Sequence, residues 1–277
     1  MLGAMAEPRT VLTTGANSGI GLATLLEMAR RGHRSVGTVR SRAKARAVHD
    51  AARDAGVEVE TVLLDVTEAT GCQRVVEQVR PDVLVNNAGF STTGAVEDVG
   101  DREARLAMET MVIAPMRLAR LSLPHMRERG WGRIVNLSSI FGLTSAPLNG
   151  WYQAAKHAIE GLSDALRIEV ASSGVGVVLI EPGGFKTGIW DGAGSDIDGH
   201  AGSRYESAYR RTLQGIRLTE PILGNPQTVA RVIAGAAEAR WPRARYLVGY
   251  DAQAVRLYDR VVPTMVRDRL TRIALGL

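Results

Sequence analysis

The chain has a single cysteine, few aromatic residues and no long hydrophobic run. Cys72 is the only cysteine among 277 residues, which excludes an intrachain disulfide and a cysteine-rich metal site. We expect Cys72 to pack as a small apolar side chain. No apolar run approaches the ~20 residues of a membrane span, and residues 1–8 lack the charged, apolar and small-residue regions of a signal peptide. The sequence therefore predicts a soluble cytoplasmic protein with no metal site and no integral membrane span.

Aromatic residues make up only 5% of the chain, and such residues would be needed beside its basic residues in a nucleic-acid site. The formal net charge is +5 and the pI is near 9.7. The arginines are scattered along the chain with acidic residues among them, and no basic stripe with stacking aromatics is present. The pattern argues against nucleic acid as a partner and assigns most of the charge to solvated surface.

Apolar β-rich runs alternate with helical patterns along most of the chain. This alternation predicts right-handed crossovers and a parallel sheet with helices on both faces, and continuously apolar strands suit a sheet that is covered on both sides. A hydrophobic content of 45% is ample for a packed core. We expect strands at 9–14, 34–39, 58–64, 82–86, 132–138, 175–181 and 245–249. We expect helices at 19–31, 42–55, 67–79, 101–129, 151–172 and 226–239.

Two stretches depart from this alternation. Residues 187–224 are rich in Gly, Ser and Asp. We expect them to form a loop or lid over the carboxyl ends of the strands, where open α/β sheets bind ligands; a disordered surface insertion is the competing interpretation. Residues 252–277 carry apolar residues at helical spacing and several arginines, which predicts a helical extension. Docking on the fold is the default, and contact with another subunit or with a membrane surface stays open.

A glycine-rich turn joins the first expected strand to the first expected helix. Glycines let the backbone turn sharply and approach a ligand without a Cβ in the way. The helix N-terminus that follows presents unpaired N–H groups and a positive dipole end, which suit a pyrophosphate. The spacing is G-x-x-x-G-x-G rather than G-x-G-x-x-G. The turn is therefore a candidate nucleotide site, made of Gly15, Asn17, Ser18, Gly19, Ile20 and Gly21.

The second expected strand ends without an acidic residue, since no Asp or Glu lies between Gly32 and Val48. NAD sites usually place an acid here to bond the ribose 2′-hydroxyl, whereas an arginine accommodates a 2′-phosphate. Arg40 ends this strand and offers planar, charge-assisted bonds to phosphate. The sequence therefore predicts NADP(H) as the cofactor. The competing interpretation is that Arg40 faces solvent or stacks on the adenine.

Tyr152 and Lys156 lie four residues apart in an expected helix, and this spacing places them on one face. An unperturbed tyrosine titrates near ~10, and a fixed cation nearby favours the phenolate and lowers that pKa. The pair is therefore a candidate proton-transfer device for an alcohol or a carbonyl. Tyr-x3-Lys alone is a weak signal, because amphipathic surface helices also contain it.

Five motifs follow one another along the chain: Thr14-Gly15-x3-Gly19-Ile20-Gly21, Asn86-Asn87-Ala88-Gly89, Ser138-Ser139, Tyr152-x3-Lys156 and Pro182-Gly183. They cover most of residues 9–190, and with them the chain resembles a short-chain dehydrogenase/reductase. The resemblance implies one Rossmann-type domain over residues 1–277, with a doubly wound parallel α/β sheet of about seven strands. It also implies an NADP(H)-dependent oxidoreductase that acts on a hydroxyl/carbonyl pair.

The same resemblance implies roles for individual residues. Ser139 would bond the substrate oxygen, Tyr152 would exchange its proton, and Lys156 would hold the nicotinamide ribose while lowering the tyrosine pKa. Ser139 is the candidate because alternation along the strand sends its neighbour Ser138 to the other face. Further cofactor contacts are implied for Asp65 and Val66 around the adenine, Asn87, Ala88 and Gly89 near the adenine ribose, Pro182 and Gly183 beside the nicotinamide, and Thr187 at its carboxamide.

Met111 stands where the family commonly carries a catalytic asparagine. In the family, the main chain of that asparagine helps to hold a water that links the lysine to solvent. Met111 keeps the carbonyl, and Pro115 has no N–H to donate to it, so we expect activity to survive. The competing hypothesis is a nucleotide-binding sensor or scaffold with weak or vestigial catalysis. A non-redox lyase or epimerase on the same fold is a third.

Residues 90–99 resemble the corresponding loop of hydroxysteroid and retinol dehydrogenase-like members. Apolar side chains would then line a pocket for a lipophilic ketone, aldehyde or secondary alcohol, with core packing as the competing interpretation: Met108, Leu143, Pro147, Trp151, Phe185, Ile189 and Trp190. Family members often assemble through the long helix and the helix that bears Tyr152. A homodimer or homotetramer is therefore expected.

Overall fold

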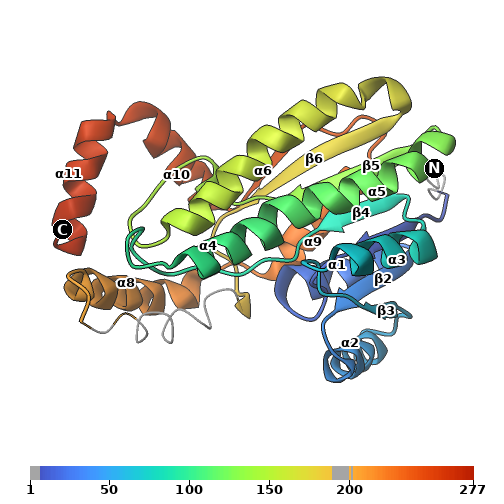
Figure 1. Ribbon diagram of the computed structural model, residues 1–277, viewed down its shortest axis with the longest axis horizontal. Helices are drawn as coiled ribbons and strands as arrows, with labels where there is room; N and C mark the ends of the chain where they lie inside the picture. The colour runs from blue at the N-terminus through green and yellow to red at the C-terminus, as the bar shows by residue number, and fades with distance from the viewer. Residues whose placement is uncertain (1–6, 189–199, 201) are drawn as a thin grey trace.

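The computed structural model describes residues 7–188, 200 and 202–277. Its centre is one parallel sheet in the order β3-β2-β1-β4-β5-β6-β7, with helices packed on both faces (Figure 1). The predicted α/β fold with a doubly wound sheet of seven parallel strands is confirmed for the described residues. The strands are β1 (Thr10–Thr13), β2 (Arg34–Val39), β3 (Glu60–Leu63), β4 (Val83–Asn86), β5 (Gly132–Leu137), β6 (Val175–Pro182) and β7 (Arg245–Val248).

The helices form a layer on each side of the sheet. Helices α1, α2 and α9 pack on one face, and α3, α5 and α6 pack on the other. No helix in the described part of the chain is long and apolar enough to cross a membrane. The α-helices are α1 (Gly19–Arg30), α2 (Arg42–Asp54), α3 (Ala69–Val79), α4 (Asp101–Met108), α5 (Ala114–Glu128), α6 (Gly150–Glu169), α8 (Glu206–Thr219), α9 (Pro226–Glu238), α10 (Tyr250–Val261) and α11 (Thr264–Leu275). Short segments are η1 (Glu109–Ile113), η2 (Ile140–Gly142), η3 (Ala171–Ser173) and η5 (Glu220–Ile222).

The central strands are buried on both faces, and this explains their apolar sequences. Every residue of β4 and β5 is buried. Cys72 is fully buried beside this core, as expected, and its Sγ lies 3.2 Å from Val66 O. The strand order reverses between β1 and β4, since β2 and β3 lie on one side and β5 to β7 on the other. A crevice at the carboxyl ends of strands next to such a reversal is where doubly wound sheets bind ligands.

The helix expected over 101–129 is divided in the structure. It consists of α4, the π-helical segment η1 and α5. In η1, Ala114 N donates to Glu109 O, five residues earlier, and Pro115 has no N–H to donate. Hydrophobic spacing does not reveal such a local change of hydrogen bonding, so the sequence predicted one continuous helix. Single π-helical turns are frequent near functional sites, and Met111 lies in this one.

The prediction of a loop across 187–224 is wrong for its second half, which contains α8. Long-range contacts stabilise this helix: Tyr209 Oη donates to Asp98 Oδ2 and accepts from Ala95 N, both at 2.7 Å. Residues 189–199 and 201 lie outside the described residues. The predicted extension 252–277 is helical, and Pro263 separates α10 from α11.

Candidate active site

The glycine turn between β1 and α1 has a backbone that only glycine fits. Gly15 has φ +64° and Gly19 has φ +54°, in the left-handed region that other residues rarely adopt. A Cβ on Gly21 would lie 2.4 Å from both Asn87 Nδ2 and Gly15 O. The turn is therefore free of side-chain atoms at these three positions, as close approach of a ligand to the backbone requires.

The N-terminus of α1 offers hydrogen-bond donors at this turn. Ser18 is the N-cap residue, but its side chain accepts no bond from the first helical turn. Asn17 Nδ2 lies 3.2 Å from Ser18 Oγ instead. Amide groups at a helix N-terminus without a side-chain cap suit an anion. The predicted residues at 15 and 17–21 all lie in this turn or in the first residues of α1. Together they form a cradle of backbone amide groups, which fits the pyrophosphate of a dinucleotide.

The turn after β4 is hydrogen bonded to the glycine turn. Asn87 Nδ2 donates to Thr14 O at 2.9 Å and to Gly15 O at 3.2 Å. Thr14 Oγ1 accepts from the backbone N–H groups of Asn87 and Ala88, each at 3.0 Å. Gly89 follows beside Met111, whose Sδ would lie 3.4 Å from a Cβ at Gly89. Asn87 and Ala88 therefore border the glycine turn directly, and Gly89 follows them on the side of Met111.

Arg40 directly follows β2, at the same edge of the sheet as the glycine turn. Ala16 N donates to Thr38 O at 3.0 Å, which holds the end of β2 beside the glycine turn. The Arg40 side chain is exposed, so its guanidinium is accessible to a phosphate group. Hydrogen bonds from Thr67 and the nearby charge of Arg40 lower the pKa of Asp65. Val66, predicted beside the adenine, is 7% exposed and packs in the core.

Ser139, Tyr152 and Lys156 come together at the carboxyl end of β5. Ser139 is the N-cap of η2, and its Oγ accepts from Phe141 N at 3.2 Å. Its side chain is also hydrogen bonded to Tyr152. Ser138 instead lies on the Glu160 side, where it lowers the pKa of the Glu160 carboxyl group. Lys156 Nζ lies 5.5 Å from the centre of the Tyr152 ring. A hydroxyl, a phenol and an ammonium group thus share one edge of the sheet.

Burial shifts the pKa values of this group. Burial raises the pKa of Tyr152 to about 12, and the bond with Ser139 offsets only part of that effect. Burial also lowers the pKa of Lys156 to about 8. Lys156 Nζ donates to Leu137 O at 2.7 Å. Desolvation of the phenol is the dominant influence on the Tyr152 pKa in this structure, and a lowering of that pKa by the Lys156 charge stays a prediction.

A buried charged cluster behind Lys156 was not anticipated from the sequence. Arg245 Nε lies 3.1 Å from Glu160 Oε2 and 3.2 Å from Glu181 Oε1. Burial raises the pKa values of both carboxyl groups. Glu160 continues the four-residue spacing of Tyr152 and Lys156, and this repeat was the available signal. Glu181 and Arg245 come from β6 and β7, and nothing in the sequence links them to α6.

The turn after β6 lies at the same edge of the sheet. Pro182 ends β6, and Gly183 N donates to Val248 O at 2.9 Å. Asp251, at the start of α10, accepts from Gly184 N at 2.5 Å, so α10 closes over this turn. Thr187 lies against the glycine turn, because a Cβ on Gly19 would be 3.2 Å from the Thr187 Cβ.

Apolar side chains pack around Tyr152. Met108, Met111 and Phe141 pack in one cluster with it, and the Phe141 ring meets the Tyr152 ring edge-on at 6.4 Å. Phe185 lies in a separate core cluster with α9. The prediction that Phe185 lines the pocket is therefore wrong, and core packing explains it. Ile189 and Trp190 lie outside the described residues.

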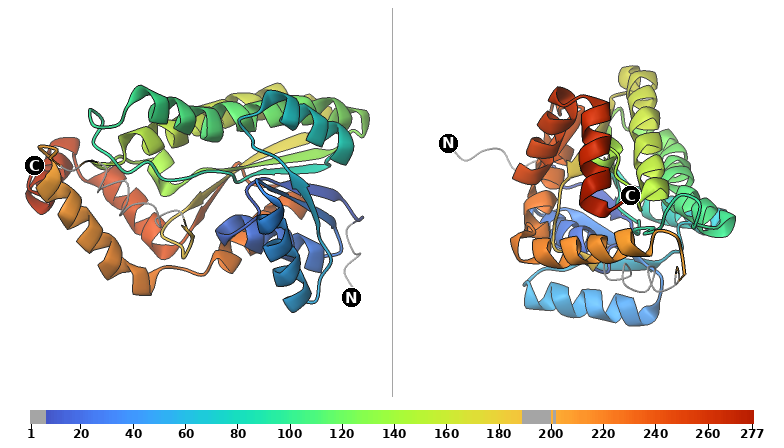
Figure 2. Two further views of the ribbon diagram at one scale, coloured as in Figure 1. Left: turned by 60° about the horizontal axis from the view of Figure 1, so that its bottom comes forward. Right: turned by 90° about the vertical axis from the view of Figure 1, so that its left-hand side faces the viewer.

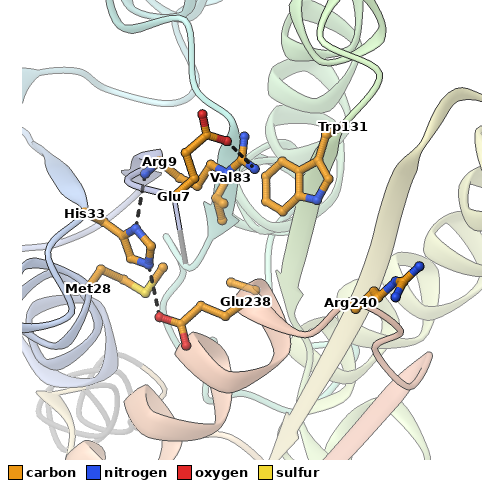
Figure 3. A pocket seen from close by; sticks show the side chains of 9 residues that line it. Glu7, Arg9, Met28, His33, Val83, Trp131, Glu238 and Arg240 are labelled. Atoms are coloured by element: carbon orange, nitrogen blue, oxygen red, sulfur yellow. Dashed lines mark hydrogen bonds and ion pairs between the residues drawn. The ribbon is translucent and has the colours of Figure 1, made fainter. Parts of the chain in front are cut away.

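A cavity of about 250 Å³ lies at the opposite, amino edge of the sheet (Figure 3). Several of its polar side chains are hydrogen bonded or paired with one another. His33 Nδ1 accepts from Arg9 N at 3.2 Å, and His33 Nε2 lies 3.0 Å from Glu238 Oε1. The Arg9 guanidinium stacks 4.3 Å from the centre of the Trp131 ring. This cavity is remote from the residues described above and offers them no substrate space.

Comparison with known proteins matches most of the chain to one family. The family model described as short chain dehydrogenase matches residues 9–198. An uncharacterized oxidoreductase of Bacillus subtilis, YusZ, is 33% identical over 264 residues, covering 92% of this chain and 94% of that protein. A 3-ketodihydrosphingosine reductase of Bacteroides thetaiotaomicron is 32% identical, with 88% of each chain covered. An NADPH-dependent 3-dehydrocapnine reductase of Ornithobacterium rhinotracheale is 30% identical, with 95% of each covered.

Solved structures agree with this placement. A short-chain dehydrogenase from Streptomyces avermitilis superposes with a TM-score of 0.78 at 32% identity, covering 98% of this chain and 97% of the other. A second protein, from Beutenbergia cavernae, is described as a putative NAD(P)-dependent gluconate 5-dehydrogenase with bound NADP. It superposes with a TM-score of 0.76 at 27% identity and covers 91% and 99% of the two chains.

Proposed function

Because the chain belongs to the short-chain dehydrogenase/reductase family, whose members are oxidoreductases acting on CH–OH groups, we propose that it is an NADP(H)-dependent reductase of a lipophilic ketone or aldehyde. The observation that carries this proposal is the meeting of Ser139, Tyr152 and Lys156 at the carboxyl end of β5, the same edge of the sheet as the glycine turn. The cofactor, when bound, supplies the hydride. The chain's own residues have to orient the substrate and move one proton.

The protonation states favour reduction. With a pKa of about 12, the Tyr152 phenol keeps its proton at neutral pH and can donate it to a substrate oxygen. Ser139 Oγ, hydrogen bonded to the same phenol, holds that oxygen in place. Lys156, with a pKa of about 8, is an ammonium group below that pH and supplies the positive charge that stabilises the phenolate left behind.

Two observations support NADP(H) over NAD(H). Arg40 is exposed at the end of β2, beside the glycine turn, where a 2′-phosphate would lie. One relative is named NADPH-dependent, and one related structure contains NADP. The apolar cluster of Met108, Met111 and Phe141 beside Tyr152 supports a lipophilic substrate. The sphingoid ketone named for one relative belongs to that chemical class.

The test is an NADPH-consumption screen over ketones and aldehydes, including 3-ketodihydrosphingosine, run with Tyr152→Phe beside the unmodified protein. We expect turnover of at least one lipophilic carbonyl and a loss of roughly 10²–10⁴-fold in Tyr152→Phe, because proton donation is removed. NADPH affinity should be kept in the variant. Activity retained in Tyr152→Phe would remove Tyr152 from the proton-transfer role.

Met111 favours a second candidate, a nucleotide-binding sensor with weak catalysis. The Met111 side chain is 2% exposed and packs against Tyr152, where the family commonly has an asparagine. This candidate requires NADPH binding without turnover of any carbonyl in the screen. A Met111→Asn variant separates the two: a large gain in rate indicates a crippled proton relay, and an unchanged rate indicates a relay that runs through the backbone.

Assembly as a homodimer or homotetramer is part of the proposal. Exposed apolar side chains occur on η1 and α6, where Ile113 is 48% exposed and Ile168 is 70% exposed. Burial of such residues on a second copy is favourable. Light scattering on the purified protein tests this, with Ile168→Asp as the variant expected to yield a smaller species.

A further inference from the structure

The C-terminal helices α10 and α11 are covered by little of the remaining protein. They lie at one end of the molecule, and in the right-hand view of Figure 2 both face the viewer. Only Ala252 is fully buried in them. Their apolar side chains are unusually accessible, with Leu257 at 63%, Val261 at 68% and Met265 at 86%. Large apolar residues gathered in this way mark an interaction surface.

Helix α11 docks through one face and leaves an apolar stripe on the other. Leu275 packs on α8 beside Leu213, and Arg211 Nη1 donates to Ile273 O and Ala274 O at the end of α11. The α11 stripe, formed by Val266, Leu270 and Ile273, follows the i, i+4, i+7 spacing of one helix face. These three side chains are 47%, 51% and 67% exposed. The face turned away from α8 is therefore apolar and unpartnered in the described residues.

Arginines flank this stripe. Met265, Arg269 and Arg272 repeat the same i, i+4, i+7 spacing one position earlier, so they form the adjacent row on the helix. Both arginines are exposed, and neither has a carboxylate within salt-bridge distance among the described residues, unlike Arg267, which pairs with Asp259. On α10, Arg260 lies beside Leu257 and Val261 in the same way. Apolar residues beside unpaired arginines are typical of helices that lie on an anionic membrane surface.

We propose that α10 and α11 bind the surface of a bilayer that contains anionic phospholipids. The α11 stripe would enter the boundary between headgroups and acyl chains, and Arg260, Arg269 and Arg272 would meet the lipid phosphates. A second copy of this chain is a poorer occupant. Two identical stripes placed face to face would bring their flanking arginines together, and like charges at an interface oppose association.

The surface is also continuous with the candidate active site. Asp251 in the first turn of α10 binds Gly184 N next to the Pro182–Gly183 turn, so α10 starts at the edge of the sheet where the catalytic residues lie. A membrane bound along α10 and α11 would place that edge near lipid. Exposed apolar residues and arginines alone define this surface, whichever substrate the protein binds.

The experiment is co-sedimentation of the full chain with vesicles. Vesicles of phosphatidylglycerol and phosphatidylcholine in equal parts are compared with phosphatidylcholine alone. We expect binding to the anionic vesicles that weakens as salt is added and little binding to the neutral ones. Leu270→Ser with Ile273→Ser should weaken binding at least about tenfold. Arg269→Gln and Arg272→Gln should each weaken it about fivefold.

A matched control carries the same kinds of substitution at the far edge of the sheet, Leu63→Ser on β3 and Arg46→Gln on α2. Leu63 is 45% exposed, close to Leu270, and Arg46 is exposed. The control variant should bind vesicles like the unmodified protein. Equal binding by the stripe variant and the unmodified protein overturns the inference, as does an absence of binding to anionic vesicles. A stripe variant that changes only the oligomeric state shows that a second copy covers the stripe. None of these readouts uses substrate, so they leave the proposed function untouched.

Discussion

Glu181 Oε1 on β6 lies 3.2 Å from Arg245 Nε on β7, although the Glu181 side chain is fully buried. The same Nε atom lies 3.1 Å from Glu160 Oε2, so one guanidinium faces two buried carboxyl groups. Burial raises the pKa of Glu181 to about 7, and the charge of Glu160 adds to the effect. Near neutral pH Glu181 is therefore partly protonated, and Glu160, its neighbour at Arg245, lies four residues beyond Lys156 on α6.

The free energy of unfolding should fall as the pH rises, because of Glu181. Its pKa is higher in the folded protein than the ordinary 4.5, so its contribution to the free energy of unfolding is complete below about pH 4.5 and is lost as the pH rises through about 7. The loss is on the order of 3 kcal/mol for a shift of this size.

Urea unfolding across this pH range should show the decline in the free energy of unfolding, and Glu181→Gln should flatten it. Asp164→Asn is the control: the charge of Asp164 is the smallest of the influences on the Glu181 pKa, so this variant should keep most of the decline. Equal slopes for Glu181→Gln and the unmodified protein would contradict the assignment.

The pH profile of activity should show the titration of Lys156. Burial lowers the pKa of this lysine to about 8 in the free protein, and the ammonium form is needed to stabilise the Tyr152 phenolate. We expect kcat/KM for NADPH-driven reduction to fall as the pH rises through about 8, since kcat/KM reports groups of the free enzyme. Tyr152, with a pKa of about 12, does not titrate in this range.

A Lys156→Arg variant tests this interpretation, because a guanidinium stays charged up to a pH of about 12. Its activity should be lower overall, since the fork of an arginine does not fit the position in which Lys156 Nζ donates to Leu137 O. The fall of its kcat/KM as the pH rises through about 8 should nevertheless be absent. The same limb near pH 8 in Lys156→Arg would assign the titration to another group.

Cofactor preference should depend on Arg40. Replacing it with serine removes a charge-assisted contact to the 2′-phosphate, and we expect the Kd for NADPH to rise roughly 10- to 100-fold. NADH lacks that phosphate, so its Kd should change little. Fluorescence titrations with both cofactors measure this, and Arg46→Gln, an exposed arginine of α2, serves as the control. Tighter binding of NADH than of NADPH by the unmodified protein would reverse the proposal.

Gly21 should tolerate no side chain. An alanine Cβ there would lie 2.4 Å from Asn87 Nδ2 and Gly15 O, so the two turns that form the cradle have to separate. We expect Gly21→Ala to lower Tm and to weaken NADPH binding more than about tenfold. Gly161→Ala is the matched control, since nothing lies within 4 Å of its Cβ position on α6. It should stabilise the protein by about 0.5–1 kcal/mol. Unchanged NADPH affinity in Gly21→Ala would mean that the ligand does not approach this turn.

Much of the fold followed from patterns within short segments. Strands β4 and β5 are apolar throughout because helices cover both faces of the sheet, and that composition is visible in the sequence. The glycine spacing between β1 and α1 was also visible, because a backbone that excludes Cβ atoms requires glycine. Helix α8 was missed, since it depends on Tyr209 contacting Asp98 and Ala95 far along the chain.

Tyr152 also combines a feature set by local sequence with one set by distant contacts. Its four-residue separation from Lys156 places both on one helix face, which the sequence states directly. The sign of the pKa shift depends on how deeply the phenol is buried by Met111, Phe141 and their neighbours. Burial is a sum over contacts from several elements, and local spacing carries no information about it.

By itself the sequence determined the strands and most of the helices along the chain, the turn that only glycine can make and the helix face that carries the phenol and the amine. These features depend on neighbours within one or two turns of the chain. The tertiary structure alone decided the pairing of Arg245 with Glu160 and Glu181, the direction of the Tyr152 pKa shift and the exposure of α11. Each of these depends on desolvation and on charges that meet only when distant segments pack together.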